Sequence, residues 1–177
     1  MALIYITGVE GSGKSAVCKE LHKLGFESHD MDDEGIACIH SKETGLPDKD
    51  IPDYKKRTAD WTAQHSWRII DSKMQKLAKS SNDNTVFLCG TADNEEDYLL
   101  LFNQVIALYA EPEVVIHRML TRTGKNNYGK APFEQQIVLD KYKTATEKYD
   151  RMHAIVIDSF DSIKNVVSAV LQASDLS

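Results

Sequence analysis

An octet near the start of the chain has the residue types and spacing of a phosphate-binding loop. Residues 8–15 read Gly-Val-Glu-Gly-Ser-Gly-Lys-Ser and fit the pattern G-x-x-x-x-G-K-[ST]. Its glycines let the backbone curl so that several N–H groups point inward, and a helix that starts there adds its positive dipole end. Lys14 would bring a full charge to the β- and γ-phosphates, and the Ser15 hydroxyl is a ligand for Mg²⁺. This phosphate loop predicts a nucleotide donor site.

The segments on either side of the phosphate loop supply the context that the motif needs. Residues 3–7 form an apolar, strand-like run. Val17, Leu21 and Leu24 recur at the spacing of one helix face, and Gly25 stands where a helix would stop. The alternative is a glycine-rich turn with an exposed lysine. Such a turn would not require the apolar strand before it or the helical spacing after it. We expect nucleotide contacts from Gly8, Glu10, Gly11, Ser12, Gly13, Lys14, Ser15 and Ala16.

Two carboxylates follow the second predicted strand, residues 26–29. Asp30 and Asp32 are one residue apart at what would be the carboxyl edge of a parallel sheet, where ligands of such folds collect. One carboxylate could approach Mg²⁺ through water while the other receives the proton of an acceptor hydroxyl. A solvated acidic turn is the alternative, because Asp33 and Glu34 come next. The pattern favours Asp30, with Ser15, as metal ligands and Asp32 as the catalytic group.

A polar and aromatic pattern follows downstream. Arg57, Trp61, Gln64 and Arg68 recur at spacings of four, three and four, which predicts one face of a helix. Guanidinium groups beside an indole could clamp an anionic or planar acceptor, and Arg57 is the preferred member. An ordinary exposed helix face is the alternative. The opposite face of the same predicted helix would be an apolar stripe of Ala63, Trp67, Ile70, Met74 and Leu77.

Positive charge gathers in residues 117–130 of an otherwise acidic chain. Arg118 and Arg122 are four residues apart, which predicts that they share a helix face, one over the base and the other reaching the transferred phosphate. The glycine- and lysine-containing loop at 124–131 has the composition of a closing lid that excludes water. A solvated basic helix end is the alternative.

The remaining periodicities predict an α/β fold in a single domain covering residues 1–177. Short apolar runs alternate with helical patterns, and several runs are uniformly apolar, as in a parallel sheet covered on both faces. Pro112 and Pro132 are placed to begin helices, and apolar stripes predict helices over 138–152 and 163–170. The predicted strands are 3–7, 26–29, 85–89, 104–110 and 154–158, with an insert of about 30–81 and a lid of about 118–132.

Composition excludes several other classes of protein. The chain is 42% hydrophobic and 27% charged, its net charge is -6, and no apolar stretch is long enough to span a bilayer. No secretion signal is recognisable at the start, so we expect a cytoplasmic protein without a membrane or nucleic-acid partner. Cys18, Cys38 and Cys89 lack paired spacing, which argues against disulfides and structural zinc.

Four segments together resemble the nucleoside monophosphate kinase and shikimate kinase group of small P-loop kinases. They are "IYITGVEGSGKSAV", "DMD" after the second strand, "LCGTA" after the third, and "HRMLTRTGKNNYGK". The resemblance implies a three-layer α/β/α fold with a five-stranded parallel sheet of order 2-3-1-4-5, an acceptor-binding insert and a mobile lid. Nucleoside monophosphate kinases, gluconate-type kinases and dephospho-coenzyme A kinase share this plan.

Shikimate kinases are similar in layout, since Asp30, Asp32 and Arg57 fall on their acceptor-side pattern. Gly90 falls within their triple glycine, which is Cys89-Gly90-Thr91 here. Their second acceptor-binding arginine would fall near Ala145, where this chain has none, and this departure argues against shikimate itself. The resemblance thus implies Asp32, Arg57 and Gly90 as acceptor-binding residues.

Together these features predict a phosphotransferase that uses ATP and Mg²⁺ to phosphorylate a small-molecule acceptor such as a nucleotide, nucleoside, hydroxy acid or sugar. Lys14, Asp32 and Arg122 would be catalytic, and Arg118, with the loop at Ser159 and Phe160, would flank the adenine. The alternative is a nucleotide-binding regulatory ATPase without an acceptor, and a nucleic-acid-binding role is a third. A guanine-specific switch is disfavoured because the sequence has no Asn-Lys-x-Asp element.

Overall fold

The computed structural model describes residues 1–123 and 127–176 and is built on a five-stranded sheet. All its strand pairs are parallel, and the order is β2-β5-β1-β6-β7. Counted along the sheet's own strands, this is the order 2-3-1-4-5 that the resemblance implied. The strands are β1 (Leu3–Thr7), β2 (Glu27–Asp30), β5 (Val86–Cys89), β6 (Gln104–Tyr109) and β7 (Ile155–Asp158), each within about a residue of its predicted range.

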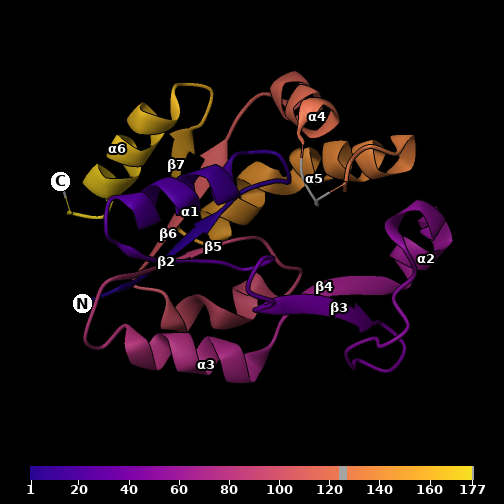
Figure 1. Ribbon diagram of the computed structural model, residues 1–177, viewed down its shortest axis with the longest axis horizontal. Coiled ribbons are helices and arrows are strands. Elements are labelled where there is room, and N and C mark those ends of the chain that lie inside the picture. The colour runs from indigo at the N-terminus through magenta and orange to yellow at the C-terminus, as the bar shows by residue number, and fades with distance from the viewer. Residues whose placement is uncertain (124–126, 177) are drawn as a thin grey trace.

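Helices cover both faces of this sheet and complete the predicted three layers (Figure 1). Helices α1 (Lys14–Lys23) and α6 (Ile163–Ala173) pack on one face. The other face is covered by α3 (Asp71–Ser80), the 3-10 segment η2 (Glu95–Leu101) and α5 (Pro132–Arg151), and α4 (Pro112–Thr121) packs beside α5. Pro112 and Pro132 begin their helices as predicted, since a first-turn proline sacrifices no hydrogen bond.

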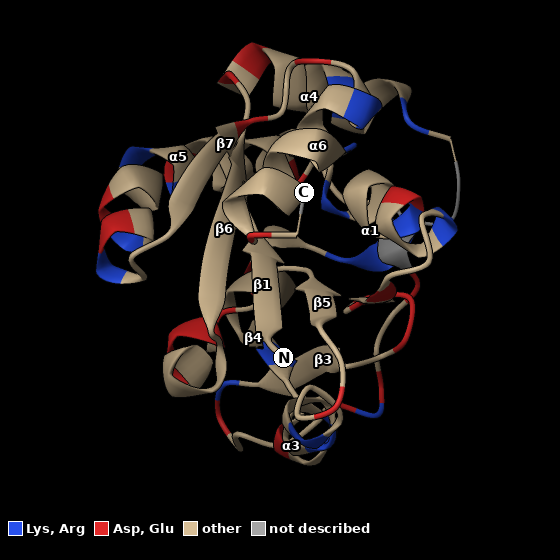
Figure 2. Cartoon of the chain, turned by 90° about the vertical axis from the view of Figure 1, so that its left-hand side faces the viewer, with Lys and Arg blue, Asp and Glu red and all other residues tan. Residues whose placement is uncertain are grey.

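The central strands are apolar on both sides because both faces are covered. Along β1, Ile4 and Ile6 point into the layer of α1 and α6, whereas Leu3 and Tyr5 point into the layer of α3. All four side chains are at most 2% exposed, and each contributes about 1.5–3 kcal/mol by burial. In Figure 2 the strands β1, β5 and β6 carry no charged residue, and the charges lie on surrounding helices and loops.

The prediction of one continuous helix through residues 57–77 was wrong. The insert contains β3 (Ala37–Ser41), a 3-10 turn η1 (Tyr54–Lys56), α2 (Ala59–Ala63) and β4 (His65–Ile69) before α3 begins. Strands β3 and β4 form a separate antiparallel pair, in which Ala37 lies opposite Ile69 and Ser41 opposite His65. Over a short stretch, apolar residues three or four positions apart occur in strands as well as in helices. Hydrophobic spacing alone therefore does not distinguish a helix from a short strand pair.

The first helix ends one residue earlier than its apolar stripe suggested. Leu24 is the cap residue after α1 and is 56% exposed, so it does not belong to the buried stripe of Val17 and Leu21. Gly25 follows with φ 89°, the left-handed conformation expected for a helix stop. Over the described part of the chain, none of the helices has the length and hydropathy required to cross a bilayer.

Candidate active site

The phosphate loop joins the end of β1 to the start of α1. Gly8 has φ 141°, and a Cβ atom there would lie 2.4 Å from the carbonyl oxygen of Leu108, so a larger residue cannot be accommodated. Gly13, with φ 106°, caps α1 and brings no side chain to compete for the first-turn N–H groups. Those N–H groups and the helix dipole form an anion-binding site at this end of α1.

Lys14 lies folded over the phosphate loop. Its Nζ donates hydrogen bonds to the carbonyl oxygens of Gly8 at 2.6 Å and Val9 at 2.8 Å. Burial lowers the pKa of Lys14, although the nearby carboxylates of Glu10 and Asp32 oppose this shift. A desolvated ammonium group that is held only by carbonyl dipoles gains strongly from a phosphate, because the electrostatic attraction is less screened there than in water.

Glu10 forms an ion pair that the sequence did not predict. Its Oε1 accepts a hydrogen bond from Nζ of Lys141, a residue of α5 that is 131 positions away in the chain. Burial by itself would raise the pKa of Glu10, but the charges of Lys141 and Lys14 hold it below the ordinary value. The same pair raises the pKa of Lys141 despite desolvation. The pair fastens α5 to the phosphate loop.

Asp30 and Asp32 occupy the turn after β2, and their environments differ. The Oδ1 atom of Asp30 accepts hydrogen bonds from the backbone N–H groups of Asp32 at 3.0 Å and Asp33 at 3.1 Å, so Asp30 shapes the turn. Asp32 stays solvent-accessible. The protein around its carboxylate nevertheless displaces water, and this desolvation, followed by the charge of Asp30, raises the pKa of Asp32. The charge of Lys14 opposes the rise, so Asp32 is within electrostatic range of the phosphate loop.

The donor groups at this edge fit Mg²⁺ that is held mainly by phosphates and water. Ser15 lies exposed in the first turn of α1, and Asp30 has a second carboxylate oxygen. Within residues 1–123 and 127–176, no group of three or more His, Cys, Asp or Glu side chains forms a dedicated metal cage. Mg²⁺ retains waters and usually takes one or two protein ligands plus substrate phosphates, so a complete protein cage is not required.

Strand β4 carries Trp67 to Asp32, a contact that the sequence did not predict. The Trp67 side chain acts on the Asp32 carboxylate and favours its charged form, which lowers the pKa of that group and partly offsets its desolvation. Trp67 is fixed in turn by the loop after β5: its N–H donates to Oδ2 of Asp93 at 2.8 Å, and its carbonyl oxygen accepts from the N–H of Asp93 at 2.7 Å. The insert is thus attached to the sheet next to Asp32.

The predicted polar face of Arg57, Trp61, Gln64 and Arg68 does not exist, because these residues lie on different elements. Arg57 precedes α2, Gln64 caps its end and Arg68 belongs to β4. The guanidinium of Arg57 lies 5.3 Å from the Trp61 ring centroid, while Arg68 reaches Asp97 at 3.7 Å. Because α2 precedes His65, which lies opposite Ser41, Arg57 is near the end of the β3–β4 pair that is farther from Asp32 (Figure 1).

Gly90 has a packing reason to be glycine. A Cβ atom added there would lie 2.4 Å from the Cβ atom of Met31, which is fully buried. The close approach of the β5 loop to the turn after β2 therefore requires glycine whether or not an acceptor contacts it.

The two arginines of the predicted lid diverge. Arg118 is in α4, but the helix ends at Thr121, and Arg122 has φ -59° and ψ 140°, so the predicted shared helix face is wrong. Arg118 donates to the carbonyl oxygen of Ser159 at 2.7 Å and lies 3.5 Å from that of Ser12. Arg122 instead donates to the carbonyl oxygen of Tyr128. Residues 124–126 of the expected lid and of its loop at 124–131 lie outside the described residues.

Arg122 is nevertheless within electrostatic range of the phosphate loop. Desolvation lowers the pKa of Arg122, and the carboxylates of Asp32, Glu134 and Glu10 oppose that shift. Asp32 and Glu10 belong to the turn after β2 and to the phosphate loop, so the guanidinium interacts with charges of both elements.

Beneath the site lies a buried carboxylate that sequence reasoning also missed. Glu95 is 1% exposed and accepts hydrogen bonds from the Tyr5 hydroxyl at 2.5 Å and the backbone N–H of Ala92 at 3.0 Å. Nζ of Lys148 on α5 reaches its Oε1 at 2.6 Å, and Thr7 at the end of β1 also donates to it. This network connects β1, η2 and α5 directly under the phosphate loop.

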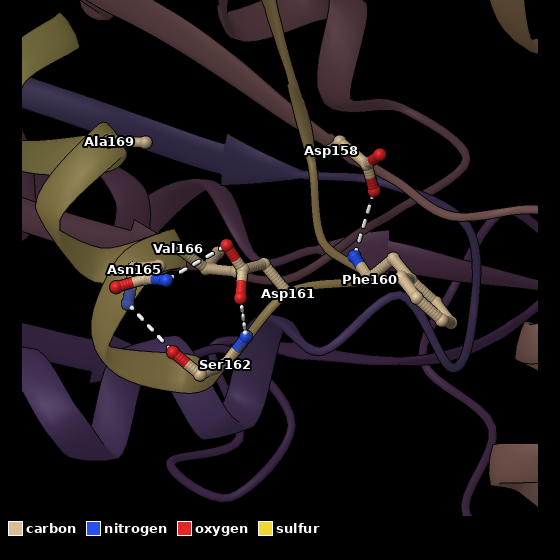
Figure 3. Close-up of a pocket in the computed structure, with 7 residues that line it drawn as sticks. All are labelled: Asp158, Phe160, Asp161, Ser162, Asn165, Val166 and Ala169. Atoms are coloured by element: carbon tan, nitrogen blue, oxygen red, sulfur yellow. Dashed lines mark hydrogen bonds between the residues drawn. The ribbon is translucent and has the colours of Figure 1, made fainter.

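A cavity of about 480 Å³ lies beside the loop between β7 and α6 (Figure 3). Phe160 projects at its edge and is 70% exposed, and the N–H of Phe160 donates to Asp158 at 2.8 Å. The cavity contains none of the phosphate-loop residues, so it is not the phosphate site. It adjoins Ser159, which Arg118 contacts from α4. Its lining is Asp158, Phe160, Asp161, Ser162, Asn165, Val166 and Ala169.

The strand, glycine loop and helix that carry Lys14, set in a parallel sheet of this order, define a P-loop protein. The fold is that of the small P-loop kinases of the nucleoside monophosphate kinase and shikimate kinase type, as the resemblance implied. Residues 4–139 match the family described as AAA domain, and because the match covers more than half of the sequence, the chain belongs to this family.

Several solved structures share this fold at low sequence identity. A shikimate kinase from Acinetobacter baumannii in complex with shikimate has 19% identity and a TM-score of 0.62, over 98% of this chain and 93% of that chain. A deoxyadenosine kinase from M. mycoides with bound dATP has 17% identity and a TM-score of 0.57, over 98% of this chain and 99% of that chain. A gluconokinase from Sinorhizobium meliloti 1021 has 18% identity and a TM-score of 0.55, over 97% of this chain and 90% of that chain. Among curated proteins, no sequence matches.

Proposed function

We propose that this protein is a phosphotransferase that uses ATP and Mg²⁺ and moves the γ-phosphoryl group to a small-molecule acceptor. One observation carries the proposal: Asp32, an accessible carboxylate whose pKa is raised, lies close enough to Lys14 of the phosphate loop for their charges to interact. A protein that only binds or hydrolyses a nucleotide has no need of such a group beside the phosphates. Solved structures of the same fold are described as kinases for shikimate, deoxyadenosine and gluconate, which supports this class of reaction.

The donor site in this proposal is the phosphate loop. Backbone N–H groups at the start of α1 and the ammonium of Lys14 hold the phosphates, and Arg118 flanks the base together with the loop at Ser159. Mg²⁺, held by Ser15 and approached by Asp30, would neutralise phosphate charge. The proposed nucleotide contacts are Gly8, Glu10, Gly11, Ser12, Gly13, Lys14, Ser15, Ala16 and Arg118.

Transfer then needs an acceptor hydroxyl between Asp32 and the γ-phosphate. The Asp32 carboxylate takes the hydroxyl proton while the hydroxyl oxygen forms a bond to the γ-phosphorus. The bond from that phosphorus to the bridging oxygen breaks, and ADP leaves with the electron pair. Lys14 and Arg122 stabilise the charge on the transferring group. If the acceptor is itself a phosphate, Asp32 positions it and need not accept a proton.

The proposed acceptor side comprises Asp32, Gly90 and Arg57, with Trp67 orienting Asp32. Arg57 would have to approach from the far end of the insert, so its role requires closure of the insert over the acceptor. Ala145 is 5% exposed and faces the core, so α5 offers no arginine at this position for a carboxylate such as that of shikimate. We therefore propose a nucleotide, nucleoside or sugar-type acceptor ahead of shikimate.

The test is ADP release from MgATP in the presence of a panel of nucleotides, nucleosides, sugars, sugar acids and shikimate. We expect one acceptor class to raise ADP release above the rate with water alone, and Lys14→Ala to abolish that increase. Failure of every acceptor, with a slow hydrolysis that the panel leaves unchanged, would instead support a regulatory ATPase.

A further inference from the structure

Helix α5 presents a lysine to the phosphate loop from the opposite side to Lys14. Lys141 lies on the face of α5 that also carries Val138, 0% exposed, and Ala145, 5% exposed, and its own side chain is 40% exposed, so its stem runs along the edge of the buried face. Tyr142, the next residue, anchors this part of the helix by donating from its hydroxyl to the carbonyl oxygen of Ala110 at 2.7 Å. The helix backbone at Lys141 is thus fixed, and the contact with Glu10 fixes the ammonium group.

The partner of Lys141 is incompletely satisfied. Glu10 accepts from Lys141 through Oε1, whereas its Oε2 is buried and has no hydrogen-bond partner among the described residues. The charge of Lys14 also acts on Glu10, while the Lys14 ammonium group itself donates to the carbonyl oxygens of Gly8 and Val9 in the same loop. Each ammonium group has three donors, and two positive charges at one loop favour a further anion there. The nucleotide phosphates are the anions that belong at this loop.

Lys141 is also within electrostatic range of the acceptor side. The carboxylate of Asp93, in the loop after β5, acts on its ammonium group in addition to Glu10. Asp93 holds the backbone of Trp67 on β4. The direct contact of Lys141 is with Glu10 of the phosphate loop, where the phosphates of a bound nucleotide would lie.

We propose that Lys141 is a further catalytic residue, whose ammonium group is held by Glu10 in the absence of nucleotide and contacts the γ-phosphoryl group during its transfer. This inference rests on the proposed phosphotransferase function. A second cation opposite Lys14 spreads stabilisation over more than one oxygen of the transferring group, and such preorganised charge acts mainly on the transition state. Phosphates that bind at the loop repel the Glu10 carboxylate and attract the Lys141 ammonium group more strongly. Lys141 therefore exchanges its contact with Glu10 for a contact with the γ-phosphoryl group.

The test compares the affinity of the protein for MgADP with its affinity for MgADP plus aluminium fluoride, which imitates the transferring phosphoryl group. The wild-type protein should bind the second combination at least about 100-fold more tightly. Lys141→Met should keep the affinity for MgADP within a few-fold and lose most of the gain from fluoride. Lys141→Arg, which keeps the charge and similar reach, should restore part of the gain.

The matched control is Lys143→Met on the same helix. Lys143 has a 72% exposed side chain and pairs with Asp140 on the surface, so its loss should change neither affinity. Thermal unfolding of each variant separates stability from function. Lys141 is only a structural brace if Lys141→Met keeps the full gain from fluoride, or if it weakens both affinities equally and lowers the unfolding temperature.

The same experiment distinguishes this inference from the proposed function. If the wild-type protein shows no gain from fluoride with any member of the acceptor panel present, the phosphotransferase proposal itself fails. If the wild-type protein shows the gain and Lys141→Met shows it equally, only the role of Lys141 is overturned.

Discussion

The Asp32 carboxylate receives opposing influences that together set its proton affinity. Desolvation and the charge of Asp30 raise its pKa, whereas Lys14 and the indole of Trp67 lower it. A general base must be deprotonated to act, yet it accepts a proton more readily when its pKa is raised. Asp32 combines these properties with accessibility to a small molecule.

Asp32→Asn should lower kcat about 100- to 10,000-fold and leave MgATP binding nearly unchanged. In the wild-type protein, kcat/KM should fall as pH drops through the pKa of Asp32, because protonation removes the base. That fall should lie above the ordinary aspartate value of about 3.9, and Asp32→Asn should abolish it. The measurement is a pH profile with a fixed acceptor.

Asp33→Asn is the matched control for this prediction. Asp33 is an exposed carboxylate of the same turn, and its side chain should be dispensable. Equal losses in both variants, or a kcat of Asp32→Asn within a few-fold of wild type, would contradict the role of Asp32 as the base.

Sequence reasoning identified the residues of local motifs and missed those that reach the site from afar. The phosphate loop and the Asp30–Asp32 pair follow directly after strands, so chain direction alone brings them to the same edge. Lys141 and Trp67 arrive through helix and strand packing, and no spacing in "DKYKTATEKYD" distinguishes Lys141 from exposed Lys143. Their roles depend on contacts across the fold, which one sequence does not encode locally.

At the scale of elements, β4 shows how a wrong helix prediction concealed a site residue. In the predicted helix, Trp67 belonged to the apolar stripe and would have been core. As a strand residue opposite Ile39, it packs against the core only in part, while its backbone is bonded to Asp93 and its side chain acts on the Asp32 carboxylate. The second sheet therefore positions the proposed base as well as covering the acceptor side.

Trp67→Phe should move the acidic limb of the kcat/KM profile to higher pH. The Trp67 indole favours the charged form of Asp32, so its removal should raise the pKa of that carboxyl further, and the base is protonated earlier as pH falls. Trp61→Phe on α2 should leave the limb in place, because Trp61 stacks on His65 at the distal end of the insert. A limb that does not move with Trp67→Phe would show that β4 does not tune Asp32.

Glu95 links three elements, and its loss should affect stability more than any surface carboxylate. Glu95→Gln removes the countercharge of Lys148 and weakens the bonds from Tyr5 and Thr7, so we expect a loss of about 3 kcal/mol in the free energy of unfolding. The neighbouring Glu96→Gln breaks a solvent-exposed pair with Arg151 and should change stability little. Urea unfolding of both variants is the measurement, and equal effects would contradict the network.

At the scale of the whole molecule, the parallel sheet could be predicted from the sequence. The insert between β2 and α3 and the end of α4 could be predicted only in part. Uniformly apolar strands separated by helical patterns require a covered parallel sheet, and the phosphate loop fixes which strand is central. The residues between β2 and α3 pack on one another and on the loop after β5, so local periodicity could not reveal β3 and β4. Arg118 and Arg122 diverge because α4 ends at Thr121 and Arg122 already has an extended backbone, a helix end that their spacing did not reveal.

In the proposed mechanism, the donor groups, Asp32 and Lys141 come from three separate parts of the chain and would act on one phosphoryl group. Convergence of this kind serves transfer between two substrates, since hydrolysis needs only the donor side and water.

The most direct test of this account follows the γ-phosphate itself. The protein is incubated with Mg²⁺ and γ-phosphate-labelled ATP in a pool of small metabolites, and the fate of the label is measured. We predict that label appears on a small molecule in amounts equal to the ADP formed, and that Asp32→Asn abolishes this transfer. Label found only as inorganic phosphate, at the same rate in wild type and Asp32→Asn, would contradict the central claim.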